Sequence, residues 1–217
     1  MPESHKSVRV AVNVMRARLT VIGFNIAIVS FQIAQLGRAA DGLRVPGLER
    51  TVHVVADMQL YMALGLSVMA LLAFILSCEI DEAGVCTHWS LMAGDLLMYL
   101  ALAHTVAGFF APLATIIGIV AGELPHKAAE INILKIGAIV TGGAAWFLAK
   151  YVGPIISLVR SPFDRRINII LGIAYLLVLL VFSWLTAQTV RVESAVSTDQ
   201  LGMFFSVLRE LVQPLRW

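Results

Sequence analysis

Long apolar blocks separated by short polar connections dominate this chain. They cover residues 19–37, 60–78, 136–158 and 167–187, and a longer block covers residues 90–121. A helix needs about 20 apolar residues to cross the roughly 30 Å of hydrocarbon in a bilayer. The pattern therefore predicts an all-α fold, a polytopic transmembrane helical bundle with about five spans.

The third block is too long for one straight crossing. At 1.5 Å per residue, a helix over residues 90–121 would extend for about 48 Å. Pro112 lies near its far end and removes one bond of the helical ladder. Two structures stay open: a tilted helix kinked at Pro112, or a span to about Phe110 followed by a re-entrant or second short helix. A re-entrant segment needs cover from protein or water.

Polar segments flank these blocks and divide the chain into three parts. Residues 1–18 are a basic N-terminal segment, residues 19–187 form the transmembrane domain, and residues 188–217 form a C-terminal tail. From Gln200 onward, the tail places its apolar residues largely on one side of a helix and ends at Trp217. We expect an amphipathic helix lying in the membrane interface.

The composition narrows the class of protein and the partners that the chain could have. The chain is 59% hydrophobic and 14% charged, whereas a soluble domain is about 45–50% apolar and about 25% charged. Its net charge of +2 is too small to suggest a nucleic-acid partner. We expect a multi-pass protein of a bacterial inner membrane, with the lipid bilayer as a partner.

The first block carries amides that a lipid-facing helix would avoid. Asn25, Gln32 and Gln35 form one stripe when the block is drawn as a helix. The opposite side carries small residues and is predicted to be a packing face: Gly23, Ala27, Ser30 and Ala34. The amides either bond to neighbouring helices or line a water-filled path formed by several copies. In the fifth block, Asn168, Tyr175 and Thr186 share a face, and this face is the second candidate lining.

Ionisable residues inside the blocks are candidates for proton handling. His88, Asp95 and Tyr99 share one face, and a carboxylate near an imidazole could bind a proton or a cation. Alternatively, Asp95 lies close to the headgroups and pairs there. His104 lies on the opposite face and deeper; we interpret it as a helix contact, with a b-type haem at His104 as an alternative. Lys150 is interpreted as an interfacial anchor.

Sequence motifs favour no enzyme. There is no P-loop, HExxH, GxSxG or CxxC pattern, so we predict no catalytic residue, no metal ligand and no cofactor. Cys78 and Cys86 frame an acidic loop, where they either pair on an oxidising side or stay free.

These observations favour a homo-oligomeric ion channel or pore lined by polar faces of the first and fifth helices. Two alternatives stay open. The chain could be an accessory or scaffold subunit of a larger membrane complex, with its small-residue faces and tail docked to other subunits. It could also be a proton-coupled carrier that uses Asp95 as the coupling carboxylate.

Overall fold

The structure is a computed structural model that describes residues 8–9, 12–36, 54–77, 85–86, 88–193 and 203–212. The long helices are α1 (Val12–Leu36), α2 (Val54–Ser77), α3 (Ser90–Glu123), α4 (Ala128–Phe147) and α6 (Arg165–Glu193). The shorter elements are η1 (Pro125–Lys127), the π-helical turn η2 (Leu148–Val152), α5 (Gly153–Val159) and α7 (Met203–Val212). Two-residue strands, β1 (Val8–Arg9) and β2 (Val85–Cys86), pair antiparallel, with Val8 opposite Cys86.

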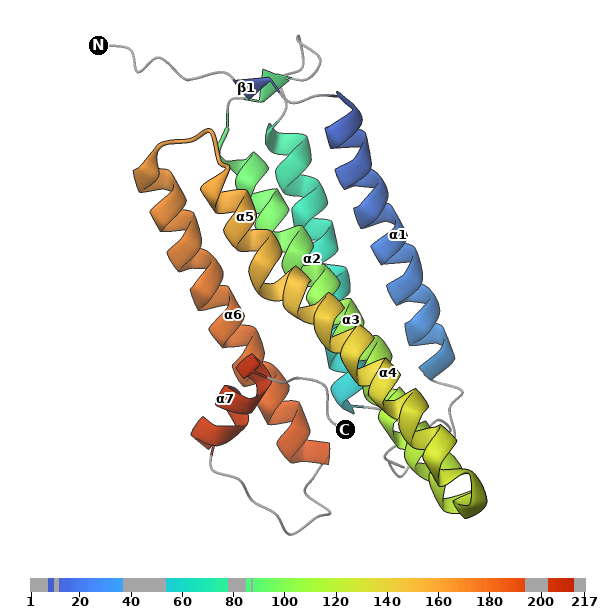
Figure 1. Cartoon of the computed structure of the whole chain (residues 1–217). Helices are drawn as coiled ribbons and strands as arrows, with labels where there is room; N and C mark the ends of the chain where they lie inside the picture. Colours follow the sequence, from blue (N-terminus) through green and yellow to red (C-terminus); the bar gives the residue numbers. More distant parts are fainter. Residues whose placement is uncertain are drawn as a thin grey trace, which may run out of the picture.

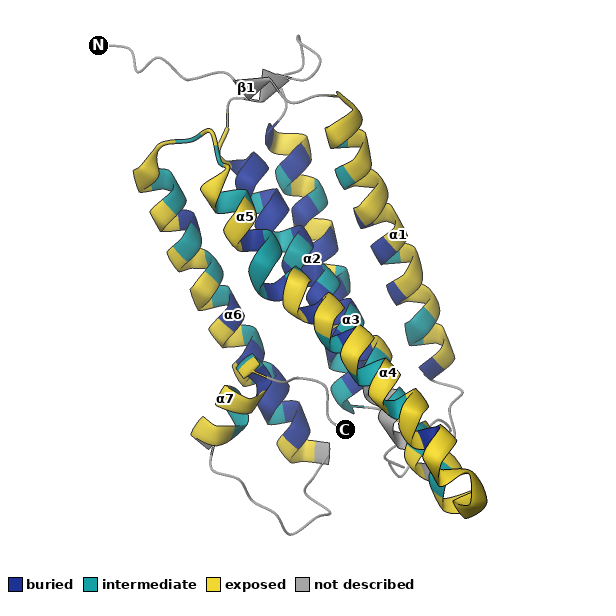
Figure 2. Cartoon of the chain, viewed as in Figure 1, coloured by how far each residue is buried: buried dark blue, intermediate teal, exposed yellow. Residues whose placement is uncertain are grey.

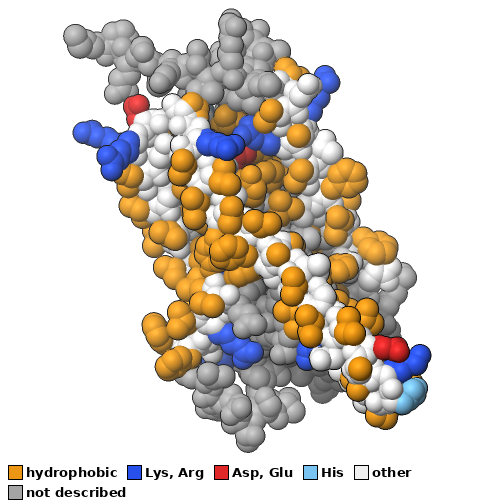
Figure 3. Space-filling model, in the orientation of Figure 1, with side chains coloured by type: hydrophobic (Ala, Val, Ile, Leu, Met, Phe, Trp, Pro, Cys, Tyr) orange, Lys and Arg blue, Asp and Glu red, His pale blue; other side chains and the backbone are white. Residues whose placement is uncertain are grey.

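The predicted all-α class is confirmed, and the long apolar helices are compatible with the predicted multi-pass character. Within the described residues, 5 helical segments are long and apolar enough to cross a membrane: Val12–Leu36, Val54–Ser77, Ser90–Phe110, Pro125–Val159 and Arg165–Val192. They run roughly alongside one another as a bundle (Figure 1). On the visible face, hydrophobic side chains cover the middle, and Lys and Arg side chains gather towards its two ends (Figure 3). An apolar belt between two charged zones is the surface that a bilayer requires.

The first part of α3 is the centre of the bundle. In the most apolar stretch of Ser90–Phe110, 72% of the residues are buried, against 11% in that of Pro125–Val159. Buried positions accordingly concentrate on α2 and the upper part of α3, whereas α4 is mostly exposed (Figure 2). The outer helices therefore present most of their apolar side chains to lipid, and α3 carries the contacts that hold the bundle together.

Small residues let α2 and α3 approach closely. A Cβ atom on Gly94 would lie 2.8 Å from Phe74 Cε1, and one on Gly108 would lie 2.8 Å from Leu60 Cδ2. The buried Ala101 lies midway between the two glycines, so the three small residues recur at the same helical face. In membranes, such faces allow helix backbones to pack without large side chains between them.

Helix ends differ from the ends of the apolar blocks. The second helix begins at Val54 instead of residue 60, and α4 begins at Ala128 instead of residue 136. Hydropathy marks the apolar middle of a span, whereas the helix continues into polar surroundings as long as its backbone bonds are made. The third helix continues past Pro112 as far as Glu123. Neither the kink at Pro112 nor a re-entrant segment is confirmed, and both stay predictions.

The predicted packing face of α1 is wrong within this chain. Its small residues are exposed, and the side that packs against the bundle carries Ile22, Asn25 and Val29. The side of α1 that carries Asn25 is therefore the inner side, because Asn25 finds a polar partner on α2. The domain boundaries stay predictions, and the proposed pairing of Cys78 with Cys86 falls outside the described residues.

Candidate functional site

Asp95 is paired with an arginine of another helix. The Arg18 guanidinium Nη2 lies 2.6 Å from Asp95 Oδ2, and the Asp95 side chain is 4% exposed against 20% for Arg18. The same guanidinium lies 5.7 Å from the centroid of the Phe74 ring. A charge-assisted hydrogen bond at a buried position is strong only while both partners are present. This pair therefore ties the second turn of α1 to the second turn of α3.

The three amides of α1 have different surroundings. Asn25 is buried, and its Nδ2 donates to Ser67 Oγ of α2 at 2.9 Å. Ser67 in turn donates to the carbonyl of Ala63 at 2.8 Å. Gln32 is half-buried and Gln35 is exposed. One amide thus joins two helices inside the chain, while the other two lie towards its surface.

The remaining predicted residues at the α3 and α6 ends lie apart from one another. His88 is exposed beside Trp89, and no contact between His88 and Asp95 occurs in the described part of the chain. The Tyr99 ring lies against Gly153, where an added Cβ would be 2.6 Å from ring carbons. Asn168 donates through Nδ2 to the carbonyl of Phe163 at 3.2 Å. Among the described residues, no hydrogen bond or ion pair joins His88, Asp95 and Tyr99, although Asp95 and Tyr99 lie one turn apart on α3.

A proline creates an unusual backbone turn in the last third of the fourth span. Pro154 has no N–H and cannot donate to the carbonyl of Lys150, four residues earlier. The helix widens into the π-helical turn η2 just before it. Such turns occur frequently at functional sites. The hydroxyl of Tyr175 on α6 donates to the freed Lys150 carbonyl. This bond fixes η2 against α6.

Lys150 points from η2 into protein and is 5% exposed. The interpretation as an interfacial anchor is therefore wrong, because its stem does not reach the surface. Its Nζ donates to the backbone carbonyl of Glu210 on α7 at 3.0 Å and lies 4.6 Å from the Trp146 ring centroid. The neighbouring Tyr151 hydroxyl donates to the carbonyl of Leu211. A carbonyl dipole and an aromatic face together surround the ammonium group.

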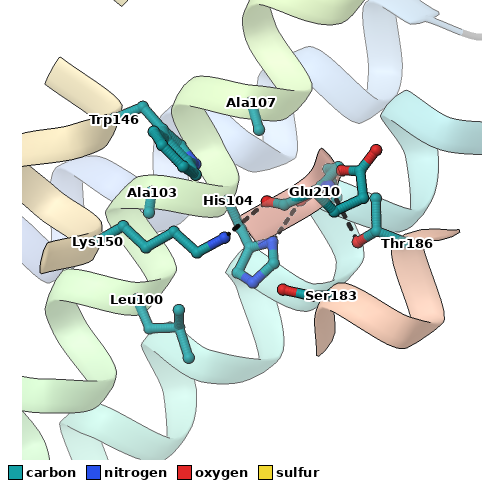
Figure 4. Close-up of a pocket in the computed structure, with 10 residues that line it drawn as sticks. Leu100, Ala103, His104, Ala107, Trp146, Lys150, Ser183, Thr186 and Glu210 are labelled. Atoms are coloured by element: carbon teal, nitrogen blue, oxygen red, sulfur yellow. Dashed lines mark hydrogen bonds between the residues drawn. The ribbon is translucent and has the colours of Figure 1, made fainter. Parts of the chain in front are cut away.

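A second polar chain reaches the same place from α2, α3 and α6. His104 Nδ1 is hydrogen-bonded to Gln59 Oε1, and Gln59 Nε2 donates to Thr186 Oγ1 at 3.0 Å. Because the Gln59 carbonyl oxygen faces the ring, His104 donates through Nδ1, and its other nitrogen, Nε2, is the acceptor of a neutral ring. All three side chains are buried. His104 and Thr186 lie beside Lys150 (Figure 4).

A small cavity of about 10 Å³ lies between these groups, which is about the space that one water molecule needs. We call its polar lining the Lys150 site: Gln59, His104, Trp146, Lys150, Ser183, Thr186 and Glu210. Leu100, Ala103 and Ala107 complete the wall. A cavity of this size has no room for a haem ring beside His104. Its donors and acceptor suit a water molecule or a small polar group.

Sequence reasoning did not identify most of the Lys150 site. From the sequence, Gln59 and Glu210 have no predicted role, and Lys150 is interpreted as an interfacial anchor. Thr186 is predicted only as a member of the face that carries Tyr175. One signal was available, since a lysine four residues before a proline inside an apolar block indicates a freed carbonyl beside a buried charge. The partners across the bundle come from α2, α6 and α7, and no spacing in the sequence links those elements.

Fold and site together describe a bundle with 5 helices long and apolar enough to cross a membrane and with a polar site among them. Comparison of the chain with protein-family models, with curated proteins and with solved structures finds no match. The function of the chain must therefore be inferred from the chemistry of its described residues.

Proposed function

We propose that this chain is a membrane transport protein with a binding site for a small polar solute or ion inside the helical bundle. The observation that carries the proposal is the Lys150 site, where a buried ammonium group and a buried imidazole share a cavity among the spans. Ionisable residues within membrane spans are costly, and they commonly mark substrate or proton pathways. A bundle that needed only packing would place apolar residues at these positions.

A proteoliposome assay tests this proposal. Purified protein is reconstituted, and uptake of radiolabelled chloride, acetate and rubidium is measured separately. We expect uptake of at least one of these ions, and we expect it to be lost in Lys150→Met and in His104→Leu. The matched control is Asp164→Asn, since Asp164 is exposed in the connection before α6. If liposomes with the protein take up no more of any of the three ions than protein-free liposomes do, the proposal is contradicted.

The homo-oligomeric pore is the second candidate. The exposed small residues of α1, Gly23, Ala27, Ser30 and Ala34, favour it because they leave an outer face on which another copy could pack closely. Gln32 is half-buried and Gln35 is exposed, and the pore candidate requires a ring of copies to bring these two amides towards an axis, with Asn168 and Tyr175 of α6 as the predicted second lining. Asn25 would enter such a lining only by breaking its bond to Ser67.

Oligomeric state and conductance decide between the two candidates. A symmetric ring whose single-channel conductance changes in Gln32→Leu would support the pore. A monomer that transports, and that loses transport in Lys150→Met, would support the internal site. The carrier alternative makes its own prediction, which is loss of proton coupling in Asp95→Asn with the fold intact.

A further inference from the structure

The end of α7 is capped by side chains of another helix. The last four carbonyl groups of a helix have no donors within that helix, and its C-terminal end carries a partial negative charge. In α7, these groups include the carbonyls of Glu210 and Leu211, which accept hydrogen bonds from Lys150 Nζ and the Tyr151 hydroxyl. Lys150 and Tyr151 therefore supply both the donors and the positive charge that this helix end requires.

The rest of α7 packs against α6 with most of its described side chains exposed. Among its residues whose side chains are described, Glu210 alone is buried, while Phe204, Phe205 and Val212 are 74%, 61% and 71% exposed. The helix lies beside the end of α6, and its Glu210 turn reaches the cavity (Figures 1 and 4). Its apolar side thus faces outward and its polar end faces inward. Two hydrogen bonds at the Lys150 site join the end of α7 to η2, and the rest of the helix packs against α6.

The two capped carbonyls resemble the head of a carboxylate. Each is an oxygen acceptor with partial negative charge, and Lys150 and Tyr151 present one donor to each of the two oxygens. A carboxylate offers two oxygens with a full charge, and hydrogen bonds to an ionised acceptor are roughly twice as strong as those to a neutral one. The adjoining cavity, with His104 and Thr186 on its wall, has space for a small extension of such a solute.

We propose that Lys150 and Tyr151 form the binding site for the carboxylate group of a small solute, and that the C-terminal end of α7 occupies this site until the solute displaces it. This proposal rests on the transport function proposed above, because it takes the Lys150 site as the place where the solute binds. It adds the chemical class of the solute and identifies α7 as the cover that opens when the solute binds.

Competition between α7 and the solute has a thermodynamic consequence. A solute that binds only the open state has an apparent affinity reduced by the population of that state. Where the open state is a minor one, populated to about 10% or less, a variant that opens the cover binds about tenfold tighter or more. Val207→Pro interrupts α7 without changing Lys150 or Tyr151, and Val207→Ala is its matched control.

The experiment follows the position of α7 in the full chain. Spin labels are attached at Phe204→Cys on α7 and Trp184→Cys on α6, two exposed positions, with Cys78 and Cys86 replaced by Ser. The distance between the labels is measured in lipid nanodiscs with sodium acetate and with sodium chloride at equal ionic strength. We expect acetate, and not chloride, to shift the distribution towards longer distances. Lys150→Met should give the long distances without acetate and respond to neither salt.

Acetate binding completes the test. We expect acetate to bind Val207→Pro about tenfold more tightly than the Val207→Ala control. An unchanged distance in acetate, or equal affinities in the two variants, would overturn the proposal. If acetate displaces α7 and liposomes still show no uptake of any ion, the binding site stands and the transport function fails. If ions are transported while acetate leaves α7 in place, the transport function stands and this proposal alone fails.

Discussion

At the scale of single residues, three buried polar groups of this protein meet a partner on another helix. Asn25 meets Ser67, Asp95 meets Arg18, and the Lys150 carbonyl meets Tyr175. An unpaired polar group in such surroundings would cost far more than the pair contributes. Each pair is therefore a position where the removal of one partner has a measurable effect.

Loss of the Asp95 charge should destabilise the fold. In Asp95→Asn, the Arg18 guanidinium keeps its charge without a counterion, and breaking a buried pair in this way costs about 3–5 kcal/mol. We expect about 2–3 kcal/mol because Arg18 retains 20% exposure and is partly screened. Unfolding by sodium dodecyl sulfate in mixed micelles measures this cost, with the exposed Asp164→Asn as control. Equal stability of the two variants would show that the pair contributes nothing.

Tyr175→Phe should leave the Lys150 carbonyl without a donor. A buried unsatisfied carbonyl costs about 1–3 kcal/mol, and the same unfolding assay measures it. The informative companion is the double variant Tyr175→Phe, Pro154→Ala, because an alanine in place of the proline would supply the missing backbone N–H. We expect the second substitution to recover part of the lost stability. A double variant less stable than the single one would show that the turn does not depend on this bond.

At the scale of elements, α3 organises the bundle through its small residues. Gly94 and Gly108 allow contact with α2, and Tyr99 lies against Gly153 of α5. The central position of α3 follows from these contacts on two sides. The sequence predicts α3 as a span, but it does not show which of its faces meets which neighbour.

The two kinds of glycine in α3 should respond in opposite ways to the same substitution. At Gly108, a methyl group would lie 2.8 Å from Leu60 Cδ2, so Gly108→Ala should push α2 and α3 apart and lower stability by about 1–3 kcal/mol. At Gly118, nothing lies within 4 Å of an added Cβ. Gly118→Ala should therefore stabilise the helix by up to about 1 kcal/mol. Thermal unfolding of both variants gives the comparison, and effects of the same sign would contradict the packing described here.

The parts of this structure that the sequence predicts depend on local chemistry. Apolar blocks predict the spans because each helix satisfies its own backbone bonds and needs only length and composition. The inner face of α1 and the Lys150 site depend instead on which helices are neighbours. Gln59, Lys150 and Glu210 are far apart in the chain, and their proximity results from the crossing of α2, η2 and α7. The exposed small residues of α1 show this limit. Their spacing predicts a packing face, but within this chain no neighbouring helix covers it.

At the scale of the whole molecule, the path of α3 determines which connections share a side of the membrane. A continuous helix over Ser90–Glu123 crosses once, so that His126 in η1 lies on the opposite side from His88. The connection at Asp164 then returns to the side of His88, because the span Pro125–Val159 crosses back. A re-entrant segment after Phe110 would instead leave His126 on the same side as His88.

Labelling of single cysteines in intact cells distinguishes these two paths. In a background with Cys78 and Cys86 replaced by Ser, cysteines are placed at His88, His126 and Asp164, all exposed positions. With a membrane-impermeant maleimide, we expect His88→Cys and Asp164→Cys to give the same result and His126→Cys the opposite one. After permeabilisation all three should react, which controls for burial. Equal reactivity of His88→Cys and His126→Cys in intact cells would mean that the third span turns back, and the bundle would then lack the continuous α3 around which its other helices pack.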